Sequence, residues 1–251
     1  MTFELLPVLH LMEQVYALPL SPARFGPYLQ LLQTEVDSEL ALPIAGFNPM
    51  AKAHINAKMN ELKAMNAEAL VSEVLEELNI GTATLPDERI IKVALNLSDD
   101  LGGGWTNRYS NDYSSRFSID ALLKRSFCSP IVWASETLTP QLIRQRSREA
   151  CYRCLYRLLH PKALTLQDHV AQEARVASAV GSILPALNAE TTEHCADFFL
   201  SNRASENYPL IFSYLYGDKA AIAFGYEPLG FGDFAGLAYA AAVGTGATAM
   251  V

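Results

Sequence analysis

The chain has 251 residues, half of them hydrophobic, which is enough to bury a large core in one or two domains. Its 19 basic and 27 acidic residues give a net charge of −8, which argues against general binding to nucleic acids or anionic membranes. Glu4 stands where a secretory signal carries positive residues, so no signal peptide is predicted. Four cysteines are too few for a disulfide scaffold in a chain of this length. A cytoplasmic protein is therefore expected.

The N-terminal region of the chain is predicted to be helical. Residues 3–17 carry apolar side chains at a near-helical period, and a second helix is expected from Pro22 to before Pro43. Asn48, followed by proline, predicts a third helix start, because the Asn side chain can accept a backbone N–H and proline fits the first turn. Apolar positions continue this helix to near Gly81, with a bend between its two halves.

Strand patterns are scarcer. In residues 89–97, RIIKVALNL, apolar side chains recur at every second position, which is typical of a β-strand. A second strand is predicted at 130–135. These elements together predict an α+β fold that is predominantly helical with a small β-sheet. We treat residues 1–251 as a single domain, and the alternative is a helical segment, residues 1–88, followed by an α+β segment, residues 89–251.

Helical patterns resume after the second strand, with Thr139 before proline and Asn188 as start signals. The predicted helices span 139–160, 165–181 and 189–203, followed by short helices from Tyr208 onward and one around 234–243. The last 18 residues, 234–251, carry no charge and reach the length of a membrane span. Because they are mostly Ala, Gly and Thr, they predict a buried helix with a small-residue tail instead.

The Gly-rich loop at 99–116 is the best candidate site. Consecutive glycines let the backbone approach a ligand and turn its N–H groups toward an anion, although both nucleotide-binding fingerprints are absent from the sequence. The candidate catalytic residues are Asp99, Asp100 and Arg108, because carboxylates at a strand end can bind a cation and Arg can bind a carboxylate or phosphate. The predicted ligand-binding residues are Gly102, Gly103, Gly104, Trp105, Asn107, Arg108 and Tyr109, and Tyr113 is a further candidate for an aromatic wall.

The alternative interpretation of this loop is structural: a glycine turn, aromatic residues packed in the core, and internal ion pairs.

A basic helix is predicted at 140–160, where five arginines face a single acid, Glu149. One interpretation is an anion clamp. The other pairs these arginines with the acidic segment 61–88, within one chain or between subunits of a homo-oligomer. Cys151 and Cys154 form a CxxC in mid-helix, where burial as small apolar side chains is expected.

Two helical segments are weak candidates for metal ligation. His169 and Glu173 share a helix face, as do Glu190 and His194. The pattern matches a di-metal carboxylate site incompletely, so no metal is favoured and the cofactor is unknown.

The best functional hypothesis is the binding or turnover of a small anionic or planar ligand at the 99–116 loop. The alternative is a non-catalytic interaction protein that forms a homo-oligomer through the 140–160 and 61–88 helices. A third hypothesis is a metal-dependent, hydrolase-like site built from helical His and Glu residues. Nucleic-acid and membrane partners are not expected.

Overall fold

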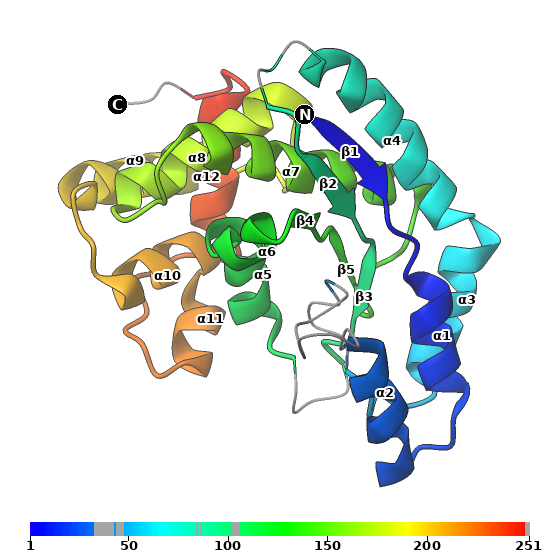
Figure 1. Ribbon diagram of the computed structural model, residues 1–251. Coiled ribbons are helices and arrows are strands. Elements are labelled where there is room, and N and C mark those ends of the chain that lie inside the picture. Colours follow the sequence, from blue (N-terminus) through cyan, green and yellow to red (C-terminus); the bar gives the residue numbers. More distant parts are fainter. Residues whose placement is uncertain (33–42, 44–47, 84, 86, 102–105, 249–251) are drawn as a thin grey trace. The chain divides into compact units, whose positions relative to one another are not determined.

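The computed structural model describes residues 1–32, 43, 48–83, 85, 87–101 and 106–248 (Figure 1). The chain forms two compact units, Met1–Cys151 and Tyr152–Val251. The boundary between them lies inside one long helix, α7 (Pro140–Leu159). Helices account for 59% and strands for 7% of the described residues, which confirms the predicted helix-rich α+β class. A subdivision at residue 88 stays a prediction.

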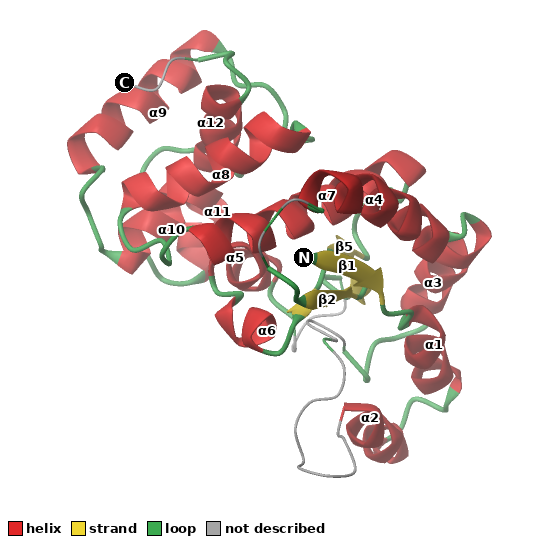
Figure 2. Ribbon diagram, turned by 45° about the horizontal axis from the view of Figure 1, so that its top comes forward, coloured by secondary structure: helices red, strands yellow, loops and turns green. Residues whose placement is uncertain are grey.

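The strands of the first unit are short, and those in the described ranges pair in parallel (Figure 2). One sheet has the order β1-β2-β4 and the other the order β3-β5. The strands are β1 (Thr2–Leu5), β2 (Ile90–Val93), β3 (Asn96–Ser98), β4 (Phe127–Cys128) and β5 (Ile131–Trp133).

The predicted strand at 89–97 corresponds to β2 and β3, which continue one another along the chain. The same offset of 35 residues relates the partners on both sides of the break, as in Lys92 with Phe127 and Asn96 with Ile131. Backbone hydrogen bonds bridge the break, from Asn96 N to Pro130 O at 2.9 Å and from Ala94 N to the Cys128 carbonyl. Pro130 has no N–H to donate, which accounts for the interruption of the ladder there.

The expectation of a helix at 3–17 is wrong for its first residues. Thr2–Leu5 forms β1 beside β2, and helix α1 begins at Leu9 and ends at Ala17. Phe3 is held by Asn79, whose side chain accepts from Phe3 N at 2.7 Å and donates to Phe3 O at 2.9 Å. A partner 76 residues away along the chain therefore sets the local structure, and the local apolar period does not show it.

The remaining helices of the first unit begin with η1 (Pro22–Arg24), a single 3-10 turn, followed by α2 (Phe25–Leu32), α3 (His54–Ala64) and α4 (Ala67–Thr82). The long helix predicted from Asn48 divides into α3 and α4 at Asn66, whose φ of 50° lies in the left-handed region. Its start is displaced: Asn48 Oδ1 accepts from Met50 N in a turn, and the helix begins only at His54. Residues 33–42 of the second predicted helix lie outside the described residues.

Much of the predicted 99–116 loop is helical. Helix α5 (Arg108–Phe117) begins after Asn107, whose side chain caps it by accepting from Ser110 N at 3.2 Å. A short helix, α6 (Asp120–Lys124), follows. Among the described residues between β3 and α5, 99–101 and 106–107 are neither helix nor strand.

The second unit is helical in the described ranges, and its helices lie close to the predicted ones. They are the C-terminal portion of α7, α8 (Leu166–Val180), α9 (Ala189–Asn202), α10 (Tyr208–Tyr216), α11 (Asp218–Ala223) and α12 (Ala235–Gly244). Helix α12 packs on α8 so closely that a Cβ on Gly244 would lie 1.9 Å from the Ala174 carbonyl oxygen. The small residues of the C-terminal segment therefore serve close helix packing. Within the described ranges, no helix is both long and apolar enough to cross a membrane.

Candidate functional site

The carboxyl ends of β3 and β5 bring polar side chains together. Because the two strands are parallel neighbours, the residues that follow them leave the sheet at the same edge. Asp99 and Asp100 follow β3, and Ser135 and Glu136 follow β5 after one intervening residue. In parallel sheets, this edge is where ligands usually bind.

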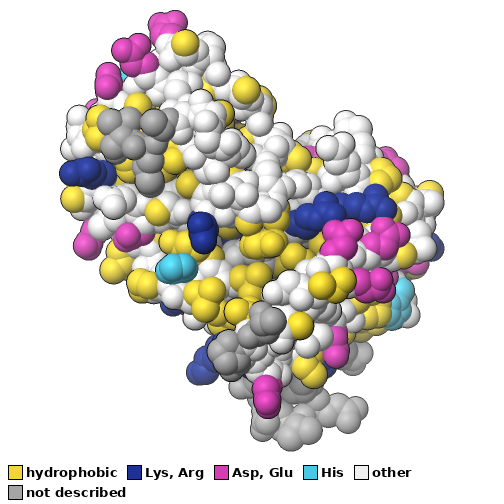
Figure 3. All heavy atoms as spheres, turned by 90° about the horizontal axis from the view of Figure 1, so that it is seen from above, with side chains coloured by type: hydrophobic (Ala, Val, Ile, Leu, Met, Phe, Trp, Pro, Cys, Tyr) yellow, Lys and Arg dark blue, Asp and Glu magenta, His cyan; other side chains and the backbone are white. Residues whose placement is uncertain are grey.

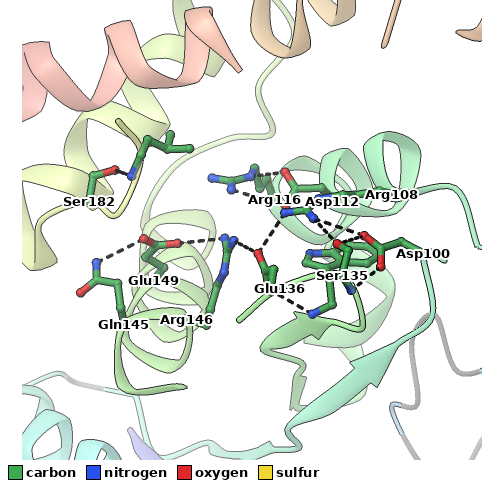
Figure 4. A network of polar contacts seen from close by, with 12 residues as sticks. Asp100, Arg108, Asp112, Arg116, Ser135, Glu136, Gln145, Arg146, Glu149 and Ser182 are labelled. Carbon is green, nitrogen blue, oxygen red and sulfur yellow. Dashed lines mark hydrogen bonds and ion pairs between the residues drawn. The ribbon is translucent and has the colours of Figure 1, made fainter. Parts of the chain in front are cut away.

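Asp100 is bonded to the chain that follows β5 (Figure 4). Its Oδ1 accepts from Ser135 N at 2.9 Å, and its Oδ2 accepts from the Ser135 hydroxyl at 2.5 Å. Arg108, the first residue of α5, donates to Asp100 Oδ2 at 3.2 Å and to Ser135 Oγ at 2.8 Å. The ends of both strands and the start of α5 are thus joined through side chains.

Glu136 extends this network toward α7. One carboxylate oxygen accepts from both Arg108 and Arg146, at 2.9 Å in each case, and the other accepts from Trp133 N at 3.1 Å. The Arg108 guanidinium also lies over the Trp133 ring, 5.5 Å from its centroid. The Arg108 side chain keeps 27% of its surface exposed, against 14% for Glu136 and 12% for Arg146. We call Asp100, Arg108, Ser135, Glu136 and Arg146 the strand-end network.

Asp99 points to a different partner. Its Oδ1 accepts from Leu101 N at 3.0 Å and lies 2.8 Å from Nε2 of His54, the first residue of α3. The Asp99 side chain is fully buried, whereas that of His54 is 31% exposed. The two consecutive aspartates therefore organise two separate clusters at one strand end.

Two further side chains of this region, Tyr16 and Arg24, are buried, and the Arg24 guanidinium lies over the Tyr16 ring. Burial, reinforced by the negative charge of Asp99, raises the pKa of Tyr16 far above its ordinary value, so the phenol stays neutral. Arg24 donates to the carbonyl groups of Pro49 and Ala51 and to those of Tyr16 and Leu18. Burial lowers the pKa of Arg24. This guanidinium ties the end of α1 to the turn that precedes His54.

The structure brings together some of the residues predicted from the sequence. Asp100 and Arg108 are in contact, and Asp99 stands next to them along the chain. Asn107 serves as the cap of α5, and Tyr109 lies half-buried on that helix. Tyr113 packs against Phe117, with ring centroids 5.1 Å apart. The predicted ligand-binding residues Gly102, Gly103, Gly104 and Trp105 lie outside the described residues.

Sequence reasoning missed His54, Ser135 and Glu136 as members of these clusters, and it considered Arg146 only among the arginines of the predicted anion clamp. Ser135 and Glu136 could have been found, because they stand at the carboxyl end of a predicted strand, as Asp99 and Asp100 do. His54 carries no such signal, since its partner is 45 residues away.

The weak metal candidates have other partners. His169 Nδ1 donates to the Thr165 carbonyl at 2.7 Å, and Glu173 binds Arg153 through both carboxylate oxygens, at 2.9 and 2.8 Å. The His194 ring packs on Phe231, at a centroid distance of 4.6 Å. Glu190 lies in the first turn of α9. Among the residues that the structure describes, no three His, Cys, Asp or Glu side chains are grouped to hold a metal ion.

The basic helix pairs with the acidic segment inside one chain. Arg144 binds Glu73 at 2.5 Å, and Arg148 binds Glu77 at 2.6 Å. Figure 3 shows a row of basic side chains next to acidic ones on this face. An open depression of about 730 Å³ runs along the start of α7, lined by Thr139, Pro140, Gln141, Arg144, Gln145 and Arg148. Cys151 and Cys154 are buried thiols, as the mid-helix CxxC predicts.

No protein-family model, no curated protein and no solved structure matches this chain at a significant level. The residues at the strand ends and their contacts are therefore the basis for assigning a function.

Proposed function

We propose that the protein binds a small anionic ligand at the carboxyl edge of β3 and β5, with Arg108 as the recognising group. The observation that carries this proposal is the position of Arg108. Its guanidinium lies between Asp100 and Glu136, keeps 27% of its side-chain surface exposed, and stands at the strand ends where parallel sheets bind ligands. Arg also presents its N–H groups in a fork that matches a carboxylate or phosphate.

A second positive feature lies at the same place. Helix α5 begins at Arg108, so the amino end of its dipole and its first backbone N–H groups add to the charge of the guanidinium. An anion arriving here exchanges with Ser135 or Glu136 as the partner of Arg108, so the guanidinium does not lose its hydrogen bonds.

The alternative of a homo-oligomer joined by the basic and acidic helices has less support. Glu73 and Glu77 already bind Arg144 and Arg148 of the same chain, so an intersubunit contact would have to replace these pairs. The metal-dependent hypothesis has less support for a similar reason, since Glu173 binds Arg153.

A thermal-shift screen of small carboxylates and phosphates tests the proposal. We expect at least one anion to raise the melting temperature of the wild-type protein with a saturable dose dependence. At a hundredfold excess of ligand over Kd, the folded state should be stabilised by about 2.7 kcal/mol. The Arg108→Gln variant should lose this shift. The matched control is Arg89→Gln, because Arg89 is an exposed arginine paired with Asp87 away from the strand-end network. Equal shifts in wild type and Arg108→Gln would contradict the proposal.

A further inference from the structure

The contact between His54 and Asp99 fixes the proton on the imidazole. Asp99 Oδ1 accepts a hydrogen bond from Leu101 N, and as a carboxylate oxygen it also accepts from His54 Nε2. In the neutral imidazole the hydrogen therefore resides on Nε2, and Nδ1 carries a lone pair. Among the described residues, His54 Nδ1 has no hydrogen-bond partner.

Asp99 anchors the His54 ring, and Arg24 anchors the backbone that precedes it. Asp99 is buried and anchored at the end of β3, while Arg24 fixes the turn at Pro49 and Ala51 that leads into α3. His54 itself remains 31% exposed. A partly exposed imidazole with a set tautomer is a directional acceptor for a ligand donor, with little freedom to lose on binding.

His54 and Arg108 are attached to one strand end. His54 binds Asp99 and Arg108 binds Asp100, and the Cα atoms of these consecutive aspartates are about 3.8 Å apart. We propose that the ligand is a small anion that also carries a hydroxyl group, with Arg108 binding the anionic group and His54 Nδ1 accepting a hydrogen bond from the hydroxyl. This inference rests on the proposed function. His54 is then the specificity-determining residue, and Asp99 its positioning residue.

The chemistry is shared by hydroxycarboxylates and by phosphate esters of polyols. Each ligand class is tested with a pair of compounds, one with the hydroxyl group and one without it. The pairs are malate with succinate, and glycerol 3-phosphate with propyl phosphate. Titration calorimetry on the full chain should show a Kd about tenfold lower for the hydroxylated member of one pair, as expected for one hydrogen bond. The pair that shows the difference identifies the ligand class.

Variants separate the two contacts. His54→Phe should abolish the difference within the pair while anion binding persists, whereas Arg108→Gln should weaken both members equally. Asp99→Ala removes the acceptor that orients Nε2, so the difference should also decrease, whereas in Asp99→Asn the amide oxygen can still accept from Leu101 N and from His54 Nε2 and should preserve it. Asp87→Ala is the matched control, because Asp87 pairs with Arg89 and, among the described residues, contacts neither His54 nor Arg108. It should leave the difference unchanged.

The outcomes distinguish the two proposals. If both members of each pair bind equally well and Arg108→Gln abolishes their binding, the hydroxyl inference is overturned and the proposed function stands. If no anion binds, both are overturned. Nitrogen-15 NMR of the free protein gives an independent reading: the neutral His54 should be the Nε2–H tautomer, and an Nδ1–H tautomer would overturn the inference whatever the binding results.

Discussion

Two arginine–carboxylate systems in this chain contain the same chemical groups but differ in their exposure to solvent. In the second unit, Arg153 and Glu173 form a bidentate pair whose side chains are only 7% and 6% exposed. In the first unit, Arg108 shares Asp100 and Glu136 and remains 27% exposed. The first system is closed to solvent, so its partners cannot exchange with a ligand. The second is open at a strand end, where an incoming anion can replace one of the partners.

The difference in solvent exposure also predicts how much stability is lost when each ion pair is broken. Removing one member of a buried pair leaves a desolvated charge, whereas an exposed charge is rescued by water. The cost of breaking an ion pair should therefore decrease from Arg153–Glu173, through the strand-end network, to the surface pairs of α7. Variants at each of these places test the gradient.

The largest effect is expected at Glu173. Glu173→Ala should lower the free energy of unfolding by about 3–5 kcal/mol, because the Arg153 charge stays buried without its carboxylate. Urea unfolding followed by circular dichroism measures the loss. Replacing both residues, Arg153→Met with Glu173→Leu, should recover most of the stability. A loss below about 1 kcal/mol in the single variant would show that this pair is not closed to solvent.

A smaller effect is expected at Glu136. Glu136→Ala should cost about 1–2 kcal/mol, because Arg108 keeps Asp100 and Arg146 keeps Glu149, 3.8 Å away. The same urea experiment compares it with Glu173→Ala. A loss as large as that of Glu173→Ala would remove the distinction between a closed and an open system.

His169 adds a pH dependence to the second unit. Burial lowers its pKa below the ordinary 6.5 in the folded chain, so the unfolded chain takes up the proton first. Stability is fully present above about pH 6.5 and should fall progressively as the pH drops toward the folded pKa. Melting temperatures between about pH 5.5 and 7.5 should show this slope.

His169→Gln should flatten that slope. His160→Gln is the control, because His160 is exposed, and it should leave the slope as in the wild type. A slope that persists in His169→Gln would assign the titration to another group.

The smallest effect is expected on the surface of α7. Arg148 and Glu77 are 31% and 63% exposed, so a double-mutant cycle should give a coupling of about 0–1 kcal/mol that weakens with added salt. A coupling above about 2 kcal/mol that is insensitive to salt would contradict the proposed order.

Local signals in the sequence predicted much of the second unit. The Asn188 side chain caps α9 by accepting from Thr191 N, and Thr165 forms a capping box with Asp168 at the start of α8. Caps and apolar periods act within a few residues, so they can be read from the chain itself. The same holds for the strand at 89–97, whose period-two pattern is local.

The candidate site could be predicted only incompletely. The aspartates at the end of a predicted strand and Arg108 were visible, because strand ends and Gly-rich loops are recognisable. Their partners Ser135 and Glu136 required knowing that β3 and β5 are parallel neighbours. The β1 strand and the His54–Asp99 contact had no local signal at all.

The sequence by itself determined the approximate bounds of most helices in the second unit, that the fold is helix-rich α+β, and that acidic and basic helices are present. Only the tertiary structure decided which charges are closed to solvent and which remain open. The physical reason is distance along the chain: Arg153–Glu173, His54–Asp99 and Ser135–Asp100 join residues 20, 45 and 35 positions apart. Such contacts, and the burial that gives them their energy, exist only once the elements have packed.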